Sequence, residues 1–404
     1  MSAFGQSIFA RLGIRATEVA LVLAIVAIVG ITLAVDENRS YWFESQTNAV
    51  EIGRQASLLG IFALGAMMVI ISGGIDLSAG SMIAFSGTSI ACTMIVLEHG
   101  PGKDLLPQWL VVALGISAGL FAGFLVGTLH AWLITSVGLP PFVATLSTLV
   151  GLRSLARIMC EYTTTAFMNG KKSQVPIEQE FFRWLSDAKN VWLWIVVFLV
   201  LAAVTWVILS KTVLGRYIYA MGGNEQAARL SGIRTDKLKW FAYVFGAMTA
   251  SLAGVFYIAN EGVSAPVNQG RGHELNAIAA AVVGGCSLQG GIGTVSGTML
   301  GALFLRLVID AVSKIIKSGA DIWEGLIVGV VVVLAVTFSQ LQQLRGSGRR
   351  LFPGAMGLWA MIVLSLTAGL ITLSTRGFHP AWIVAVITFA LVWLYGFSEK
   401  RRTA

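Results

Sequence analysis

Long apolar segments, separated by short polar stretches, make up most of this chain and limit what it can fold into. A helix needs about 20 apolar residues to cross a bilayer, and ten segments approach that length. Only 12% of the residues are charged, whereas soluble domains carry about 25%. We therefore expect an all-α polytopic membrane protein. The ten segments are 18–35, 58–72, 81–97, 109–126, 191–210, 240–259, 295–312, 322–338, 354–373 and 381–397.

Two further segments are less regular. The segment 131–159 is long but is interrupted at 138–141 by Gly-Leu-Pro-Pro, and 275–285 is short and ends in paired glycines. With them, the chain is expected to make about 12 crossings or partial crossings. The net charge of +8 does not indicate a nucleic-acid partner, because the basic residues lie at segment ends, where topology and anionic lipid headgroups account for them.

A basic polar stretch at 211–239 interrupts the apolar segments in the middle of the chain. It contains six Lys or Arg residues and two acidic residues, and membrane proteins keep such loops on the cytoplasmic side. Within it, 225–230 is predicted to form a short helix, with Asn224 as N-cap and Gly232 as the stop. A short helix that projects from a membrane domain into the cytoplasm can be gripped by another protein.

Four basic stretches indicate the orientation of the chain: 211–239, the N-terminus, the residues around Arg349 and the C-terminus. Placing all four in the cytoplasm requires even numbers of crossings between them, and the segments supply six, four and two. Arg153 and Arg157, near the outer end of their segment, count against this orientation. The expected organisation is a cytoplasmic N-terminus at 1–17, a core at 18–343, a cytoplasmic basic linker at 344–353, two additional transmembrane helices at 354–397 and a cytoplasmic tail at 398–404.

Two segments on the expected outer side carry exposed aromatic patterns. Residues 40–43 read Ser-Tyr-Trp-Phe, and 176–189 combines Phe181, Phe182 and Trp184 with charges. The second pattern is typical of an amphipathic helix lying on the surface. Both segments fit either contact with an external partner or anchoring at the membrane interface.

A glycine-rich motif occurs twice, as 72–80 (Ser-Gly-Gly-Ile-Asp-Leu-Ser-Ala-Gly) and in altered form as 283–291. Each copy lies between two apolar segments, and paired glycines permit a broken helix or a tight turn. Transporters commonly have duplicated halves with broken helices near the substrate path, which favours a pseudo-repeat. The alternative is that small residues merely allow close helix packing, as the spacing of Gly293, Gly297 and Gly301 indicates.

Asp76 in the first motif is the acidic residue that needs an explanation. A carboxylate at the centre of a membrane helix costs about 2.5–3.5 kcal/mol. One reading places Asp76 on the translocation path or a gate. The other makes Asp76 or Ser78 a cap of the next helix, and the local sequence, which is typical of a helix start, favours it.

Several function classes lack their motifs. The sequence contains no Gly-x-x-x-x-Gly-Lys-Ser/Thr phosphate loop, no His, Cys or Glu cluster with metal-ligand spacing, and few acids or bases inside the apolar segments, which ion-coupled transporters need. His130 is expected to be a packed or interfacial residue rather than a proton relay. The energy for transport is therefore expected to come from another chain.

These motifs together resemble the permease subunits of bacterial ATP-binding-cassette sugar importers, the ribose, xylose, arabinose and galactose group. The resemblance spans roughly 18–343. The sequence departs from the family at Asn276, where Asp is usual, and at Cys286, where Thr is usual, and the two helices at 354–397 lie beyond the usual end. The matching pieces are 73–80, 141–146, 215–233, 274–280 and 284–293.

The resemblance implies a core of about ten helices that forms a homodimeric pore in the bacterial cytoplasmic membrane, with both termini in the cytoplasm. It also implies a cytoplasmic ATPase subunit and an extracytoplasmic sugar-binding protein as partners. The chain itself is then not an enzyme and binds no cofactor, because ATP and Mg²⁺ are held by the ATPase. The competing hypothesis is an ion-coupled secondary transporter or channel whose basic loop only sets topology.

Two groups of candidate residues follow from the resemblance. The expected ATPase-coupling residues are Gly215, Arg216, Tyr219, Gly222, Gly223, Asn224, Glu225, Ala227, Ala228, Arg229, Gly232 and Ile233. The expected residues of the translocation path or gate are Gly73, Gly74, Asp76, Ser78, Phe142, Thr145, Glu274, Asn276, Gly284 and Gly285.

Overall fold

The computed structural model describes residues 16–36, 39–101, 105–168, 170–315, 354–376 and 378–402, with a few single positions between 323 and 337. The chain divides into a first unit, Met1–Val336, and a second unit, Thr337–Ala404. Eight of the described helices are long and apolar enough to cross a membrane. This confirms the expected all-α polytopic class.

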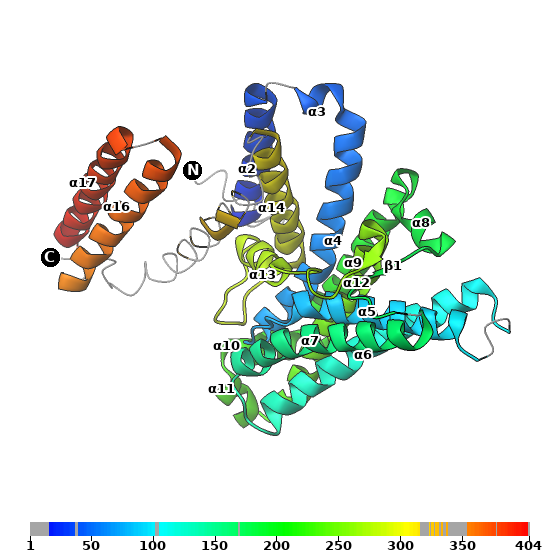
Figure 1. Ribbon diagram of the computed structural model, residues 1–404. Helices are drawn as coiled ribbons and strands as arrows, with labels where there is room; N and C mark the ends of the chain where they lie inside the picture. Colours follow the sequence, from blue (N-terminus) through cyan, green and yellow to red (C-terminus); the bar gives the residue numbers. More distant parts are fainter. Residues whose placement is uncertain are drawn as a thin grey trace. The chain divides into compact units, whose positions relative to one another are not determined.

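The first unit is a bundle of long helices joined by short helices and turns (Figure 1). Its helices are α2 (Ala16–Val35), α3 (Ser40–Phe43), α4 (Ser45–Ile71), α5 (Ala79–His99), α6 (Gln108–Thr135), α7 (Pro141–Phe167), α8 (Glu180–Ser186), the 3-10 helix η1 (Ala188–Asn190), α9 (Val191–Lys211), α10 (Val213–Gly223), α11 (Glu225–Leu230), α12 (Thr235–Glu261), α13 (His273–Val283) and α14 (Val295–Ile315). The strands β1 (Val175–Pro176) and β2 (Val263–Ser264) pair antiparallel.

Several helix boundaries differ from the sequence-based expectation, and two of them are instructive. Helix α4 begins at Ser45, well before residue 58, because polar side chains in its first half have partners: Arg54 Nη2 donates to the carbonyl of Ser186 at 2.7 Å. Helix α6 continues to Thr135, so the first residues of the segment 131–159 belong to it. The expected interruption lies between α6 and α7, and Pro141 occupies the first turn of α7, where its missing N–H costs nothing.

Helix α12 packs against α4, α5 and α6 and occupies the middle of the bundle. Four glycines spaced by four residues let α6 approach its neighbours closely. Side chains on Gly115 and Gly119 would collide with α5, and side chains on Gly123 and Gly127 would collide with α12. Membrane helices commonly pack through small residues at this spacing. Lipid tails are as apolar as the helix side chains, so the hydrophobic effect does not drive helices together and close van der Waals packing must do so.

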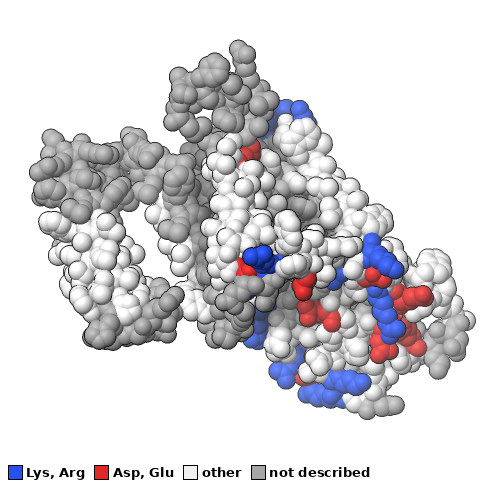
Figure 2. All heavy atoms as spheres, turned by 90° about the horizontal axis from the view of Figure 1, so that it is seen from above, with Lys and Arg blue, Asp and Glu red and all other residues white. Residues whose placement is uncertain are grey.

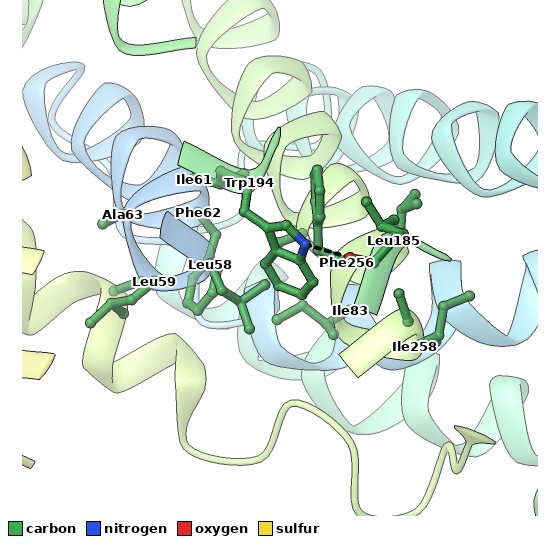
Figure 3. Close-up of a cluster of buried hydrophobic side chains, with 14 of the residues drawn as sticks. Leu58, Leu59, Ile61, Phe62, Ala63, Ile83, Leu185, Trp194, Phe256 and Ile258 are labelled. Atoms are coloured by element: carbon green, nitrogen blue, oxygen red, sulfur yellow. Dashed lines mark hydrogen bonds between the residues drawn. The ribbon is translucent and has the colours of Figure 1, made fainter. Parts of the chain in front are cut away.

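A fully buried tryptophan connects the peripheral helix α8 to the bundle (Figure 3). Trp194 on α9 donates its indole N–H to the carbonyl of Leu185 at 2.9 Å, and its ring lies 4.8 Å from that of Phe256 on α12. Phe182 and Leu185 on α8 are buried, whereas Trp184 is 45% exposed. This confirms an amphipathic helix within 176–189, held firmly on one face.

The aromatic segment 40–43 is also attached to the bundle. The hydroxyl of Tyr41 donates to Asp310 on α14 at 2.6 Å, and Lys314 lies over the Tyr41 ring. Burial and this hydrogen bond raise the pKa of Tyr41 above its usual value. Trp42 and Phe43 remain 74% and 75% exposed, so the segment offers two aromatic rings from a fixed base.

Arg153 makes hydrogen bonds inside the fold, so its position is weak evidence about which side of the membrane this helix end faces. Its Nη1 atom donates to the carbonyl oxygens of Pro266, Val267 and Gln269, at 3.2, 3.3 and 2.7 Å. The guanidinium therefore holds the turn-rich segment that leads from β2 to α13. A basic residue with this structural duty need not follow the rule that places free Lys and Arg in the cytoplasm.

The second unit contains α16 (Gly354–Arg376) and α17 (Phe378–Arg402), which pack against each other. The buried positions of α16 recur every four residues, at Gly357, Met361, Ser365 and Gly369. Several large apolar side chains on the other positions of α16, such as Trp359 and Leu370, are exposed, as lipid-facing residues would be. The role of these helices as two additional crossings stays a prediction. The linker 344–353 and most of 1–17 and 322–338 lie outside the described residues.

The glycine contacts of α6 generate a stability prediction. In Gly127→Ala the new methyl group would meet the backbone of Val244 at 2.5 Å, and such overpacking costs about 1–3 kcal/mol. The matched change Gly151→Ala, on α7, places its methyl group where nothing lies within 4 Å. We expect the first variant to lower the thermal unfolding temperature of the detergent-solubilised protein and the second to leave it unchanged or higher. Equal unfolding temperatures would contradict the close α6–α12 packing.

Candidate functional site

The polar stretch 211–239 forms two short helices, α10 and α11, where the sequence predicted one. Helix α10 was missed, although Leu214, Ile218 and Met221 have helical spacing and pack towards the core. Its start is capped by Thr212, whose hydroxyl accepts from the amide of Gly215 at 3.2 Å.

Helix α11 has the predicted ends. The side chain of Asn224 accepts from the amide of Ala227 at 2.9 Å, which confirms the N-cap. The stop at Gly232 has a φ of 81°, which glycine adopts without a steric cost.

The charges on α11 pair with each other and with the start of α12. Glu225 accepts from Lys239 at 2.7 Å and lies 3.6 Å from Arg229, which in turn lies 3.2 Å from Asp236. Exposed pairs of this kind stabilise a fold little, but together they fix the direction of α11. The apolar side chain of Leu230 is left 89% exposed. Sequence reasoning missed Leu230, because burial cannot be read from a six-residue helix.

The structure divides the expected coupling residues by exposure. Ala228 lies on the buried face of α11, so its side chain cannot contact a partner. Ala227, on the other face of the same helix, is exposed. The exposed residues are Arg216, Gly223, Asn224, Ala227, Arg229 and Gly232, the half-buried ones are Tyr219, Glu225 and Ile233, and the buried ones are Gly215, Gly222 and Ala228.

The end of α10 meets the end of α4 and the turn before α14 at a cluster of glycines, which we call the glycine node: Gly73, Gly222, Gly290 and Gly291. A side chain on Gly222 would collide with the carbonyl of Ile71 and with the amide of Gly291. A side chain on Gly290 would collide with the carbonyl of Gly222 and come within 2.8 Å of the Cα of Gly73. The amide of Gly291 donates to the carbonyl of Ile71 at 2.9 Å. Three backbones are thus in direct contact.

A side-chain hydrogen bond strengthens this junction. The hydroxyl of Tyr219 on α10 donates to the carbonyl of Gly293 at 2.9 Å. Since Gly73 follows α4 and Gly290 lies between α13 and α14, the short helices 213–230 are joined to both copies of the glycine motif.

The two motif copies end their helices with the same backbone geometry. After α4, Gly73 has a φ of 86°, and after α13, Gly285 has a φ of 94°. In each case the amide of the next residue reaches back to a carbonyl five positions earlier, which is the Schellman cap. The two bonds run from Gly74 N to Val69 O and from Cys286 N to Ala281 O, each 3.0 Å long.

This geometry corrects the register of the sequence comparison. Aligning the two copies as 72–80 and 283–291 pairs Gly73 with Gly284. The structure pairs Gly73 with Gly285, one position further on, because the cap needs its left-handed residue directly after the C-cap residue.

Asp76 and Ser78 form the non-helical approach to α5. The Oδ1 atom of Asp76 accepts from the amide of Ser78 at 2.8 Å and from its hydroxyl at 2.6 Å, and Asp76 is 6% exposed. Asp76 thus holds Ser78, the N-cap residue of α5, whose own side chain makes no cap hydrogen bond to the helix. The choice between a cap and a place on the translocation path stays a prediction. The hydroxyl of Thr145 on α7 lies 3.3 Å from the carbonyl of Ile75. Thus Thr145 lies beside the same turn.

The other expected path residues are spread more widely. Glu274 accepts from the amide of Gly272 at 3.2 Å and lies against Gly80. Phe142 is 52% exposed and Asn276 is half-buried. The remaining two, Gly284 and Gly285, lie at the far end of α13, beside Gly297 and Thr17. The structure brings together Gly73, Gly74, Asp76, Ser78 and Thr145.

Two buried residues near Asp76 were not recognised as part of this region. His130 on α6 is 0% exposed, as expected of a packed residue, and its Nε2 atom lies 2.6 Å from the hydroxyl of Thr148. Its ring lies 6.2 Å from that of Tyr243, edge to face. A side chain on Gly74 would collide with the Tyr243 hydroxyl. No signal in the sequence links residues so far apart along the chain.

The electrostatic character of the surface agrees with a membrane protein. On the face seen in Figure 2, most of the described surface carries no charged side chain, and the charged ones gather in patches. Within the described part of the chain, no three His, Cys, Asp or Glu side chains are grouped so that they could hold a metal ion.

Comparison with known proteins decides the family. The family model of the permease component of branched-chain amino acid transport systems matches residues 48–336. The chain belongs to this family of importer permeases. The region matched by the family model ends at residue 336, before α16, so the second unit lies outside the matched region. No solved structure matches the chain.

Three relatives show how closely the chain follows the family. The ribose import permease of Haemophilus influenzae is 36% identical over 296 residues, which cover 72% of this chain and 86% of the relative. The ribose import permease of Escherichia coli K12 is 32% identical over 80% of this chain and 93% of the relative. The autoinducer 2 import permease of Yersinia pestis (strain Pestoides F) is 34% identical over 80% and 83%. The comparisons confirm the expected ATP-binding-cassette permease class. They give no support to an ion-coupled transporter or channel.

The glycine node generates a second prediction, with neighbouring glycines as variant and control. In Gly222→Ala the methyl group would overlap two backbones, whereas in Gly223→Ala it would meet nothing within 4 Å. We expect Gly222→Ala to detach the end of α10 from the node, lower the unfolding free energy by about 1–3 kcal/mol and reduce uptake of the solute by at least about tenfold. Gly223→Ala should retain the wild-type unfolding free energy. Similar uptake and thermal stability in the two variants would contradict the node.

Proposed function

We propose that this chain forms the membrane path through which an ATP-binding-cassette importer carries a monosaccharide or a related small polyhydroxylated solute. The support is the family membership and the relatives, which are named for ribose import and autoinducer 2 import. The chain itself binds neither ATP nor Mg²⁺. ATP hydrolysis takes place on a cytoplasmic ATPase subunit, and the energy reaches this chain by contact.

One observation carries the proposal: α10 and α11 are exposed on one side and joined to both glycine motifs on the other. An ATPase that grips α11 would pull α10 with it. Because Gly222 touches the backbones at Ile71 and Gly291, the movement would pass to the ends of α4 and to the turn before α14. The residues of the expected path, such as Asp76 and Thr145, follow directly after the first of these ends.

Leu230 is the anchor that we assign to the contact with the ATPase. The charges around it, on Glu225, Arg229, Asp236 and Lys239, already have partners within the chain, so Leu230 is a highly exposed apolar side chain surrounded by paired charges. An exposed leucine in water gains by burial in a partner's pocket. Buried apolar anchors dominate the energy of such interfaces.

The wider assembly follows from the family. A second copy of the permease completes the pore, and an extracytoplasmic sugar-binding protein delivers the solute to the side opposite α11. The importer lies in the bacterial cytoplasmic membrane, with both termini and the stretch 211–239 in the cytoplasm. On the outer side, α8 and the ring of Trp42 offer surfaces for the binding protein or for the membrane interface.

The proposal is tested by replacing Leu230 and by a control at another exposed leucine. Leu230→Asp should weaken association with the ATPase at least about tenfold, which corresponds to about 1.4 kcal/mol, and should abolish ATP-driven uptake in proteoliposomes. Leu105→Asp changes a side chain that is 82% exposed on the expected outer side. It should leave ATPase binding unchanged.

The measurement is co-purification of the tagged permease with its cognate ATPase subunit, followed by uptake of radiolabelled ribose with the cognate binding protein. Normal binding by Leu230→Asp would overturn the assignment of α11. Uptake that persists without ATP and follows an ion gradient would overturn the importer.

A further inference from the structure

Two buried polar atoms beside the glycine node have no hydrogen-bond partner in this conformation. His130 is 0% exposed and Tyr243 is 1% exposed. The Nδ1 atom of His130 and the hydroxyl oxygen of Tyr243 are each unpartnered. Buried polar groups in native proteins are nearly always paired, so an unpaired one marks stored strain or a functional role.

The two atoms are complementary. The hydroxyl of Thr148 lies 3.0 Å from the carbonyl of Thr145, to which it donates, and 2.6 Å from His130 Nε2. The proton of the neutral imidazole is then on Nε2, which leaves Nδ1 as an acceptor. The Tyr243 hydroxyl is a donor, and the two rings already meet edge to face at 6.2 Å. A single hydrogen bond would satisfy both atoms.

The segment 72–78 lies against one of the two atoms. Gly74 packs directly on the Tyr243 hydroxyl, with no room for a methyl group between the glycine and that hydroxyl. In the same segment, the Oδ1 atom of Asp76 accepts from the amide and the hydroxyl of Ser78. Gly73, the residue before Gly74, belongs to the glycine node. A shift of α10 would therefore move the segment that confines the hydroxyl.

We propose that Tyr243 and His130 are positioning residues of the transport cycle. They are unpaired in this conformation, and the Tyr243 hydroxyl donates to His130 Nδ1 once the node has drawn the segment 72–78 away. The new bond stabilises the conformation in which the segment 72–78 has moved away. It offsets part of the free energy that this movement costs. The proposal rests on the proposed function, because it needs α10 to be moved by the ATPase.

The first test compares two Tyr→Phe variants in the same region. The Tyr219 hydroxyl donates to the carbonyl of Gly293 at 2.9 Å, so Tyr219→Phe should lower the unfolding temperature of the purified permease by a few degrees. Tyr243→Phe removes an unpaired hydroxyl and should leave that temperature unchanged or higher. A drop in Tyr243→Phe as large as that in Tyr219→Phe would mean that the hydroxyl is already partnered, and would overturn the proposal.

The second test measures ATP-driven uptake by the complete importer in proteoliposomes. Tyr243→Phe and His130→Leu should each slow uptake about threefold to tenfold, the worth of one net hydrogen bond. The double variant should be no slower than the slower single variant, since both remove the same bond. His130→Asn, which keeps an acceptor near the Nδ1 position, should restore part of the rate. Additive losses, or normal uptake in Tyr243→Phe, would overturn the proposal.

The outcome also separates this proposal from the proposed function. A wild-type complex that shows no ATP-driven uptake would overturn both. Robust wild-type uptake with unaffected Tyr243 variants would overturn only the positioning role.

Discussion

Backbone contact at the glycine node is the constraint on which the rest of the first unit depends. At Gly222 the chain has no room for a single methyl group, because the carbonyl of Ile71 and the amide of Gly291 occupy that space. Contacts between side chains can yield by changing rotamers, whereas contacts between backbones cannot. The end of α10, the end of α4 and the turn before α14 must therefore move together or separate completely. A displacement of one segment at this junction is therefore passed on to the other two.

The exposed side of the short helices α10 and α11 is held by side-chain contacts rather than by backbone contacts. Its charges form an internal network around Glu225 and Arg229, which is weak as a source of stability but sufficient to hold α11 in one orientation. The buried half, with Ile218 and Met221, belongs to the core. One short stretch thus combines a rigid attachment to the membrane domain with a surface that presents the side chain of Leu230 to the solvent. That combination suits a contact with the ATPase that must move α10 and yet form again in every transport cycle.

The sequence predicted the features that depend on local chemistry. The apolar segments, the helix 225–230 with its cap at Asn224, and the interruption before Pro141 follow from residue types at short range, and the structure has them. The missed features depend on partners distant in sequence. Helix α4 extends into a polar stretch because Arg54 finds Ser186, and the pairing of the motif copies shifts by one because only the backbone shows which glycine adopts a left-handed conformation. Likewise, His130 and Tyr243 become neighbours only after α6 and α12 have packed.

The two sets of glycines in this fold do different work, and the difference shows where the molecule can move. Gly115 to Gly127 lie within α6 and close the distance to α5 and α12; sliding one helix along another would break every contact in the row at once. Gly73 and Gly285 lie at helix ends with positive φ, where a rotation about one residue redirects the chain without disturbing a helix. Helix packing therefore defines the rigid bodies, and the caps define the hinges between them. Because Gly73 belongs to the node formed with α10, a displacement of that short helix acts directly on the hinge at the end of α4.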